Sequence, residues 1–198
     1  MARFLVLYGT TDGHTARIAR AVGDALRTRG AEVDVIEAAD ASSSIWPHDY
    51  SGVVVAASVH AGGYQAAVRS WVQAHAPILQ ERPTAFVSVC LGALQQQSRV
   101  RRDLDAIIDR FVKETGWVPT TTKIVAGALL YTRYSWIRRL VMKRIARKAG
   151  GDTDTSRDHV YTDWNDLRAF AEEFGRCVAG DVARTSADGR VRHAAAVA

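Results

Sequence analysis

Five short apolar runs alternate with longer segments of helical periodicity, and this alternation restricts the fold more than any other feature. The apolar runs occupy residues 3–8, 32–36, 52–58, 84–89 and 123–127. The run 52–58 is continuously apolar, which is typical of a strand buried on both faces, whereas 32–36 alternates only in part and suits a sheet edge. Strands that alternate with helices pair in parallel through right-handed crossovers. The sequence therefore predicts an α/β fold with a doubly wound, five-stranded parallel sheet.

Four segments after these runs carry apolar residues at helical spacing. They are 14–29, a segment around Val68 that ends before Pro77, 100–112, and a last segment that begins near Thr162 or Asp163 and extends to about Val178. Thr and Asp are both suitable caps for the start of a helix. The apolar pattern ends after Gly180. We therefore expect one domain over 1–180, with an insertion at 128–151, and a disordered tail over 181–198.

Cysteine usage and hydropathy exclude several classes of protein. Cys90 and Cys177 lie far apart and without the spacing of metal ligands, which argues against a disulfide framework or a metal site and suits a reducing compartment. The amino end leads straight into a strand without a signal peptide. No apolar run reaches the roughly 18 residues that a transmembrane helix needs.

A polar turn joins the first strand to the first helix. It contains Thr10, Thr11, Asp12, Gly13, His14 and Thr15. Threonine hydroxyls, a glycine that admits a close backbone approach and the N–H groups of the following helix together suit a phosphate. The turn lacks the Gly-Lys-Ser/Thr of a Walker A loop and the three glycines of a dinucleotide loop. Because it contains no Lys or Arg, it suits a phosphomonoester held by neutral donors.

The pattern Thr-x-x-Gly-x-Thr in this turn resembles the FMN-phosphate loop of flavodoxins. The alternative is an ordinary hydroxyl-capped turn between a strand and a helix, because Thr and Gly are common in such turns.

The loops after the third and fourth strands should converge with this turn, because ligands of such sheets lie outside the carboxyl ends of the strands. The residues of these loops are Ser58, Val59, His60, Ala61, Gly62 and Tyr64, then Cys90, Leu91, Gly92 and Ala93. We predict that they hold a flavin ring, whose faces His60, Tyr64 or Leu91 would cover. In the alternative interpretation, Gly62 and Gly63 form a flexible turn and Tyr64 is a core residue.

Several motifs in order resemble one subgroup of the flavodoxin family, the menaquinone-dependent protoporphyrinogen IX dehydrogenases of haem biosynthesis. These motifs are Ala126-Gly127-Ala128-Leu129, Tyr131-x-Arg133-Tyr134-x-Trp136, Gly150-Gly151-Asp152-Thr153-Asp154-Thr155 and Tyr161-Thr162-Asp163-Trp164. The resemblance covers about residues 1–178 and implies the strand order 2-1-3-4-5 and the cofactor FMN. It also implies oxidation of protoporphyrinogen IX to protoporphyrin IX in successive two-electron steps, with electrons passed through FMN to a quinone.

In such an enzyme the flavin supplies the redox chemistry, and the protein positions and tunes the ring. His60 lies in a predicted flavin loop and is the one catalytic candidate, as a proton relay near neutral pH; a hydrogen-bonding or packing role is the alternative. The polar turn 152–155 either lies near the active site or serves as ordinary turn and cap chemistry.

The positive charge of the chain is concentrated in one segment. Residues 115–151 contain eight Lys or Arg and no Asp or Glu, so of the net charge of +5 the rest of the chain carries −3. A helix predicted over 135–149 places Trp136 on an apolar stripe, away from Arg138, Arg139 and Lys143. The segment could contact an anionic membrane, bind the propionates of the substrate, or be a solvated helix packed onto the domain.

We assign a substrate or membrane contact to Arg133, Trp136, Arg138, Arg139 and Lys143. The expected partners are protoporphyrinogen IX, menaquinone or another quinone, and an anionic membrane surface. Nucleic acid is not expected, because no reader motif is present. The expected location is cytoplasmic and peripheral, on the inner face of the cell membrane.

Two other functions remain open at this point. One is a flavodoxin-like electron carrier without a substrate of its own, although carriers usually present an acidic face and this chain has a basic insertion. The other is an NAD(P)H:quinone oxidoreductase of related fold.

Overall fold

The structure, a computed structural model, describes residues 1–41, 45–95, 98–133, 140, 143–144, 146–147 and 151–195. Its centre is a five-stranded, wholly parallel sheet in the order β2-β1-β3-β4-β5. The strands are β1 (Arg3–Gly9), β2 (Glu32–Glu37), β3 (Gly52–Ser58), β4 (Thr84–Cys90) and β5 (Thr121–Ala126). The doubly wound sheet and the strand order expected from the sequence are both confirmed.

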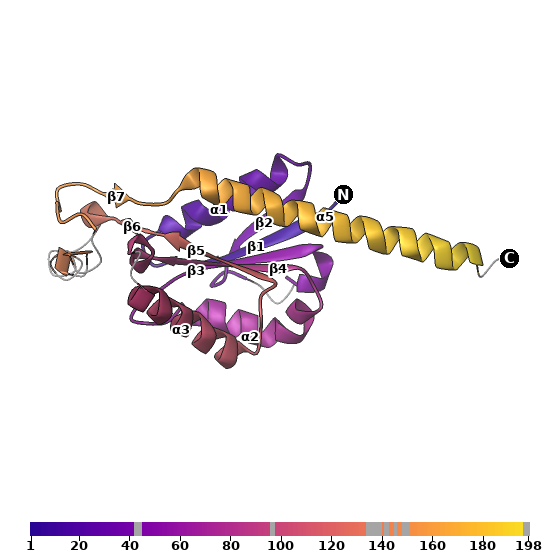
Figure 1. Ribbon diagram of the computed structural model, residues 1–198, viewed down its shortest axis with the longest axis horizontal. Coiled ribbons are helices and arrows are strands. Elements are labelled where there is room, and N and C mark those ends of the chain that lie inside the picture. Colours follow the sequence, from indigo (N-terminus) through magenta and orange to yellow (C-terminus); the bar gives the residue numbers. More distant parts are fainter. Residues whose placement is uncertain are drawn as a thin grey trace.

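Helices cover both faces of this sheet (Figure 1). The helices are α1 (His14–Arg27), α2 (Ala66–Gln80), α3 (Ser98–Thr115) and α5 (Trp164–Ala195), with 3-10 turns η1 (Pro47–Asp49), η2 (Leu91–Leu94) and η3 (Tyr131–Arg133). α1 and α5 pack on one face, and α2 and α3 pack on the other. The result is a three-layer arrangement with the carboxyl ends of all five strands at one edge.

Alternate residues of the central strands enter two separate cores. In β1, Phe4 and Val6 pack with α1 and α5, whereas Leu5 and Leu7 pack with α2 and α3. Each fully buried side chain of this kind contributes about 1.5–3 kcal/mol through the hydrophobic effect. β3 is buried on both faces and β2 lies at the sheet edge, as the two hydrophobic patterns predicted.

Pro77 lies inside α2, which continues to Gln80, so the predicted end of this helix before Pro77 is wrong. A proline removes one backbone hydrogen bond of a helix and usually disrupts it. Here the proline falls in the last turn, and its neighbours Ala76 and Leu79 are 7% and 0% exposed. Burial of this turn against the sheet outweighs the local cost of the proline.

A small second sheet follows β5. β6 (Ala128–Leu129) pairs antiparallel with β7 (His159–Val160), and a separate buried cluster forms from Leu129, Leu130, Tyr131 and Ala146. Two-residue strands carry no periodic signal, which is why the sequence did not predict them. Of the helix predicted over 135–149, residues 140, 143–144 and 146–147 are helical, and the others lie outside the described residues.

α5 begins where the sequence predicted but ends later. Asp163 caps it, because its Oδ1 accepts the N–H groups of Asn165 and Asp166, each at 3.0 Å. The helix continues past Gly180 to Ala195 and extends away from the sheet (Figure 1), so residues 181–195 are helical and not the disordered tail that we expected. Ala and Arg recur in this stretch, and both are strong helix formers that need no apolar face.

The length of α5 raises the question of a membrane span. No helix within the described ranges is both long and apolar enough to cross a bilayer.

Candidate active site

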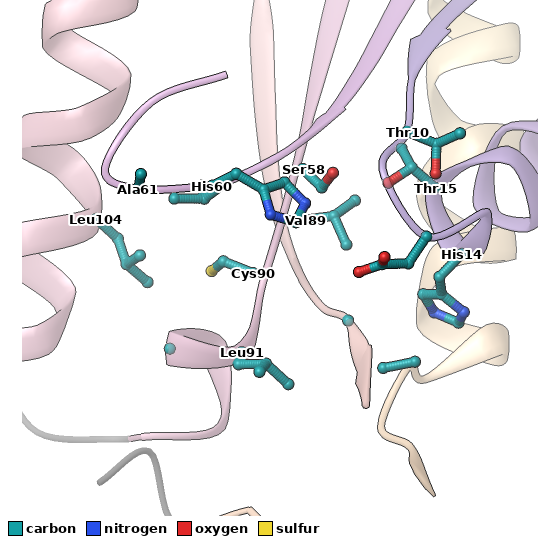
Figure 2. A pocket seen from close by; sticks show the side chains of 15 residues that line it. Thr10, His14, Thr15, Ser58, His60, Ala61, Val89, Cys90, Leu91 and Leu104 are labelled. Carbon is teal, nitrogen blue, oxygen red and sulfur yellow. The ribbon is translucent and has the colours of Figure 1, made fainter. Parts of the chain in front are cut away.

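A cavity of about 290 Å³ opens at the carboxyl ends of the strands. It is lined by Thr10, Asp12, His14, Thr15, Ser58, Val59, His60, Ala61, Val89, Cys90, Leu91, Gly92, Leu104, Gly127 and Ala128. Figure 2 shows Thr10, Thr15 and His14 grouped on one side, with Cys90 and Leu91 across the space from them. The cavity therefore has a polar end at the turn after β1 and a more apolar end at the loop after β4.

The turn between β1 and α1 is shaped by Gly13 and Thr10. Gly13 is left-handed, with φ 86°, a conformation that residues with a Cβ rarely adopt. Its N–H donates to Thr10 Oγ1 at 2.9 Å. α1 begins at the next residue, and the N–H groups in the first turn of a helix lack partners within the helix. None of the described lining residues is a Lys or Arg, so an anion here would meet neutral donors.

His14, the first residue of α1, connects this turn to the end of β5. It is 5% exposed, and its Nε2 lies 2.7 Å from Thr162 Oγ1. The Thr162 hydroxyl donates to the carbonyl oxygen of Ala126 at 2.7 Å. Since a hydroxyl has one hydrogen, Thr162 accepts from His14 Nε2–H, and Nδ1 is left as an acceptor. Burial, and next the charge of Arg17, lower the pKa of His14 to about 4, so the ring is neutral at physiological pH.

Two reciprocal backbone hydrogen bonds close a tight turn after β3. The N–H of His60 donates to the Gly63 oxygen at 2.8 Å, and the N–H of Gly63 donates to the His60 oxygen at 3.0 Å. Ala61 and Gly62 both have positive φ, 49° and 78°, as in a type I′ turn. This backbone holds the exposed side chain of His60 at the cavity.

Tyr64 lies in the core and does not line the cavity, which corrects the prediction that it covers the flavin. It is 8% exposed, and its ring packs against Phe86 and Phe111 with centroids 5.1 and 5.0 Å away. Its hydroxyl lies 2.7 Å from Ser88 Oγ, and burial raises the pKa of Tyr64 to about 12. α2 begins two residues later, and the Tyr64 ring packs in the core on the face of the sheet that α2 and α3 cover.

Cys90 is the last residue of β4 and lines the cavity, as His60 does. It is 7% exposed, and burial raises the pKa of its thiol, so the thiol is protonated at neutral pH. Leu91 and Gly92 follow in η2 and also line the cavity.

Four further predicted cofactor-binding residues lie outside the lining: Thr11, Gly13, Gly62 and Ala93. Thr11 Oγ1 instead accepts from Gln65 Nε2 at 3.2 Å, and the same nitrogen donates to Ser58 Oγ at 2.7 Å. Gln65 therefore joins the turn after β1 to the end of β3. Thr11, Gly13 and Gly62 contribute to the shape of the two turns instead of to the cavity wall.

Sequence reasoning missed four lining residues: Val89, Leu104, Gly127 and Ala128. Val89 directly precedes Cys90, and Gly127 directly follows β5, so the position of the strand ends contained the signal for both. Leu104 had no such signal, because a buried leucine at helical spacing in α3 resembles any core residue.

Of the residues assigned to substrate or membrane, only Lys143 has a described side chain, and it does not line the cavity. Lys143 is half-buried in the short helical part of the insertion. Trp136, Arg138 and Arg139 lie outside the described residues, as does the side chain of Arg133.

The polar turn 152–155 contacts the second sheet, consistent with turn and cap chemistry. Tyr161 Oη donates to Asp152 Oδ2 at 2.9 Å and accepts the Asp152 N–H at 2.7 Å, while Tyr131 Oη donates to the Asp152 oxygen at 2.9 Å. Asp154 Oδ1 accepts from the Oγ and N–H of Ser156, and these bonds lower the pKa of Asp154.

Comparisons with known proteins agree with this architecture. The flavodoxin domain family matches residues 5–156. The chain belongs to the flavodoxin family. It is 36% identical over 169 residues to the protoporphyrinogen IX dehydrogenase (quinone) of Escherichia coli strain K12, which covers 85% of this chain and 92% of that protein. It is 35% identical over 174 residues to the Leishmania major protein of the same name, across 86% of this chain and 73% of the relative.

Solved flavodoxins share the fold of this flavodoxin-family protein. An archaeal flavodoxin superposes with a TM-score of 0.53 at 12% identity, covering 89% of this chain and 98% of the flavodoxin. The oxidised flavodoxin 1 of Bacillus cereus superposes with a TM-score of 0.54 at 13% identity, covering 88% and 98%. Identities this low show the fold alone. Membership of the family implies a flavin cofactor and oxidoreductase chemistry.

The cavity of this flavodoxin-family protein fits a flavin at both ends. The polar end offers the hydroxyls of Thr10 and Thr15 and the start of α1, and no described group bonds to the buried Nδ1 of His14. Such an orphaned polar atom is expected where a polar ligand completes a site. The other end presents the apolar side chains of Val89, Leu91 and Leu104, which suit the faces of a ring.

Proposed function

We propose that this flavodoxin-family protein binds FMN and oxidises protoporphyrinogen IX to protoporphyrin IX, with electrons passed to a quinone. The proposal rests on 36% identity over 92% of the Escherichia coli protein whose name states this substrate and acceptor. We further propose menaquinone as the quinone and haem biosynthesis as the pathway, as the motifs shared with that subgroup imply.

FMN is the flavin that the polar end of the cavity favours. One phosphomonoester can be held by the hydroxyls of Thr10 and Thr15 and by the positive end of α1. No lysine or arginine in the described lining offers the additional charge that a pyrophosphate would favour.

The residues of the cavity would position the cofactor and handle protons. When bound, FMN accepts hydride equivalents from the substrate and passes the electrons on. Leu91 and Leu104 would exclude water from one end of the site. His60 is exposed at the cavity on a tight turn, where its imidazole can accept a proton from a bound substrate.

The basic insertion would bring the enzyme to its quinone. Arg144 and Arg147 are exposed in its described helical part, beside the half-buried Lys143. Basic residues of this kind attract anionic lipid head groups, and they also suit the propionates of the substrate. We therefore place the protein at the inner face of the cell membrane, as a peripheral protein in the cytoplasm.

Anaerobic mixing of the FMN-loaded protein with protoporphyrinogen IX tests the proposal. We expect flavin absorbance to fall while porphyrin fluorescence rises, and a menaquinone analogue to restore the oxidised flavin. The apoprotein under the same conditions measures the spontaneous oxidation of the substrate.

Other outcomes would assign a different function. A flavin that stays oxidised beyond the spontaneous background would overturn the dehydrogenase proposal. Rapid bleaching by NADPH would then indicate an NAD(P)H:quinone oxidoreductase. Reduction by a ferredoxin reductase without porphyrinogen turnover would indicate an electron carrier.

A further inference from the structure

His14 has three properties that together point to a ligand. It lines the polar end of the cavity beside Thr10 and Thr15 (Figure 2), and it is 5% exposed. Its Nδ1 is buried and has no hydrogen-bond partner within the described parts of the chain. A buried polar atom without a partner destabilises the free protein, so a ligand that supplies the partner binds more tightly.

The hydrogen bonds on the other side of the ring determine what Nδ1 can do. Thr162 donates its one hydrogen to the Ala126 oxygen and must accept from His14 Nε2–H, so Nδ1 carries a lone pair. The other groups at this end of the cavity are the hydroxyls of Thr10 and Thr15, the N–H groups at the start of α1 and the carboxylate of Asp12. The hydroxyl and N–H donors suit an anionic oxygen. A lone pair on Nδ1 would repel such an oxygen unless a hydrogen lies between them.

We propose that this site binds the phosphate of FMN together with one proton, which is held between His14 Nδ1 and a phosphate oxygen. The inference rests on the proposed function only in taking FMN as the ligand. Above about pH 7 a phosphomonoester is mainly a dianion, because its second pKa is about 6. The extra proton is therefore taken from solvent when the cofactor binds.

The charged groups around the ring are consistent with proton uptake on binding. Arg17, on the same helix, lies over Trp164 at 5.6 Å, and its charge helps to keep His14 neutral in the free protein. Asp12 lines the same cavity from the preceding turn. From α5 the ring meets the uncharged Trp164 edge-on at 5.8 Å, and Thr162 connects it to the carbonyl of Ala126 at the end of β5. A bound phosphate would add the negative charge that stabilises a proton at Nδ1.

Calorimetric titration of the apoprotein with FMN measures this proton directly. Titrations at about pH 7.5 in two buffers of different ionisation enthalpy give the number of protons taken up per FMN. We expect about one proton for FMN and none for riboflavin, which lacks the phosphate. Zero uptake with FMN would overturn the inference and would mean that the Thr162 hydroxyl turns to Nε2, so that Nδ1 carries its own hydrogen.

His14→Asn is the matched variant, because an amide can donate to a phosphate without gaining a proton. It should bind FMN with no proton uptake, and the Kd of the wild type should rise relative to that of the variant by about tenfold per pH unit above neutral. Proton uptake by His14→Asn equal to that of the wild type would assign the proton to another group and overturn the inference. His14→Ala should reduce the preference for FMN over riboflavin by about tenfold or more.

The titration also distinguishes failure of this inference from failure of the proposal that the protein binds FMN. A wild-type protein that binds no FMN would overturn the cofactor assignment. A protein that binds FMN tightly without proton uptake would leave that assignment intact and overturn only the role of His14.

Discussion

The hydroxyl of Tyr64 lies 2.7 Å from Ser88 Oγ, beneath the sheet and away from the flavin cavity. Ser88 is 1% exposed, so each of these hydroxyls depends on the other for a partner. Tyr64, which follows the two glycines of a loop at the flavin site, is therefore a core residue. Its contribution should be to stability and not to cofactor binding.

Replacement of Tyr64 by Phe tests this division. The change leaves the Ser88 hydroxyl without its partner and should lower the free energy of unfolding by about 1–2 kcal/mol, measured by urea denaturation of the apoprotein. The Kd of FMN should not change. Ser88→Ala and the double variant complete a double-mutant cycle. The double variant should lose less free energy of unfolding than the sum of the two single variants, because both single changes remove the same hydrogen bond. A change of about tenfold or more in the FMN Kd would mean that Tyr64 contacts the cofactor after all.

Gly9, the last residue of β1, has no space for a side chain. A Cβ there would lie 2.4 Å from Val68 Cγ2, so Gly9→Ala should destabilise the protein by about 1–3 kcal/mol through overpacking. Because Gly9 directly precedes the turn between β1 and α1, which is proposed to hold the phosphate, the same variant should also bind FMN more weakly. Gly63→Ala is the control, since nothing lies within 4 Å of the added Cβ. Equal stability of the two variants in thermal unfolding would contradict the predicted clash.

The sequence predicted the sheet and the position of the cavity because both follow from local patterns. Continuous apolar residues predicted β3 as a buried strand, and the rule for strand ends placed His14, His60 and Leu91 at one cavity. Asp163 was predictable as a cap from its position before an apolar pattern. The patterns did not determine which way each loop side chain points.

The errors arose where tertiary packing overrides local preference. Pro77 favours a helix end, but the burial of Leu79 maintains the final turn of α2. Tyr64 follows two glycines as a ligand-binding aromatic residue would, yet Phe86 and Phe111 provide a site for its ring in the core. The chain of hydrogen bonds from His14 to Ala126 joins residues that are distant in sequence, and no spacing rule reveals it.

The lowered pKa of His14 predicts that the apoprotein is sensitive to acid. The pKa falls from 6.5 to about 4 on folding, so the unfolded chain binds the proton more readily between these values. The part of the folding stability that depends on a neutral His14 is fully present above the pKa of the unfolded chain, 6.5. It is lost as the pH falls towards the pKa in the folded protein, about 4. At about pH 5 the loss relative to neutral pH should be about 2 kcal/mol.

His14→Asn provides the comparison for this pH dependence. Urea unfolding of the wild-type and variant apoproteins at several pH values should show the wild type losing more stability on acidification. Parallel stability curves for the two proteins would mean that His14 titrates normally in the folded state.

His60 should affect turnover much more than it affects cofactor binding. If its imidazole accepts a substrate proton, His60→Gln should lower kcat for porphyrinogen oxidation by about 100-fold, the usual magnitude for loss of a general base. The Kd of FMN should rise by less than about tenfold, because the side chain is one of several that line the cavity and the backbone hydrogen bonds that form the turn do not involve it. A variant with wild-type kcat would leave His60 with a hydrogen-bonding or packing role only.

Charge reversal in the basic insertion should release the protein from anionic membranes. Each basic residue near such a surface contributes about 1 kcal/mol, so changing Lys143, Arg144 and Arg147 to Glu should weaken binding to phosphatidylserine vesicles by at least about 100-fold. A matched variant reverses Arg20, Arg29 and Arg176, which are exposed outside the insertion and give the same change in net charge. If both variants sediment with vesicles equally well, the insertion has no special role in membrane binding, and binding of the substrate propionates becomes its proposed role. If only the insertion variant is released while its kcat with a water-soluble quinone is unchanged, the insertion binds the membrane that contains the natural acceptor.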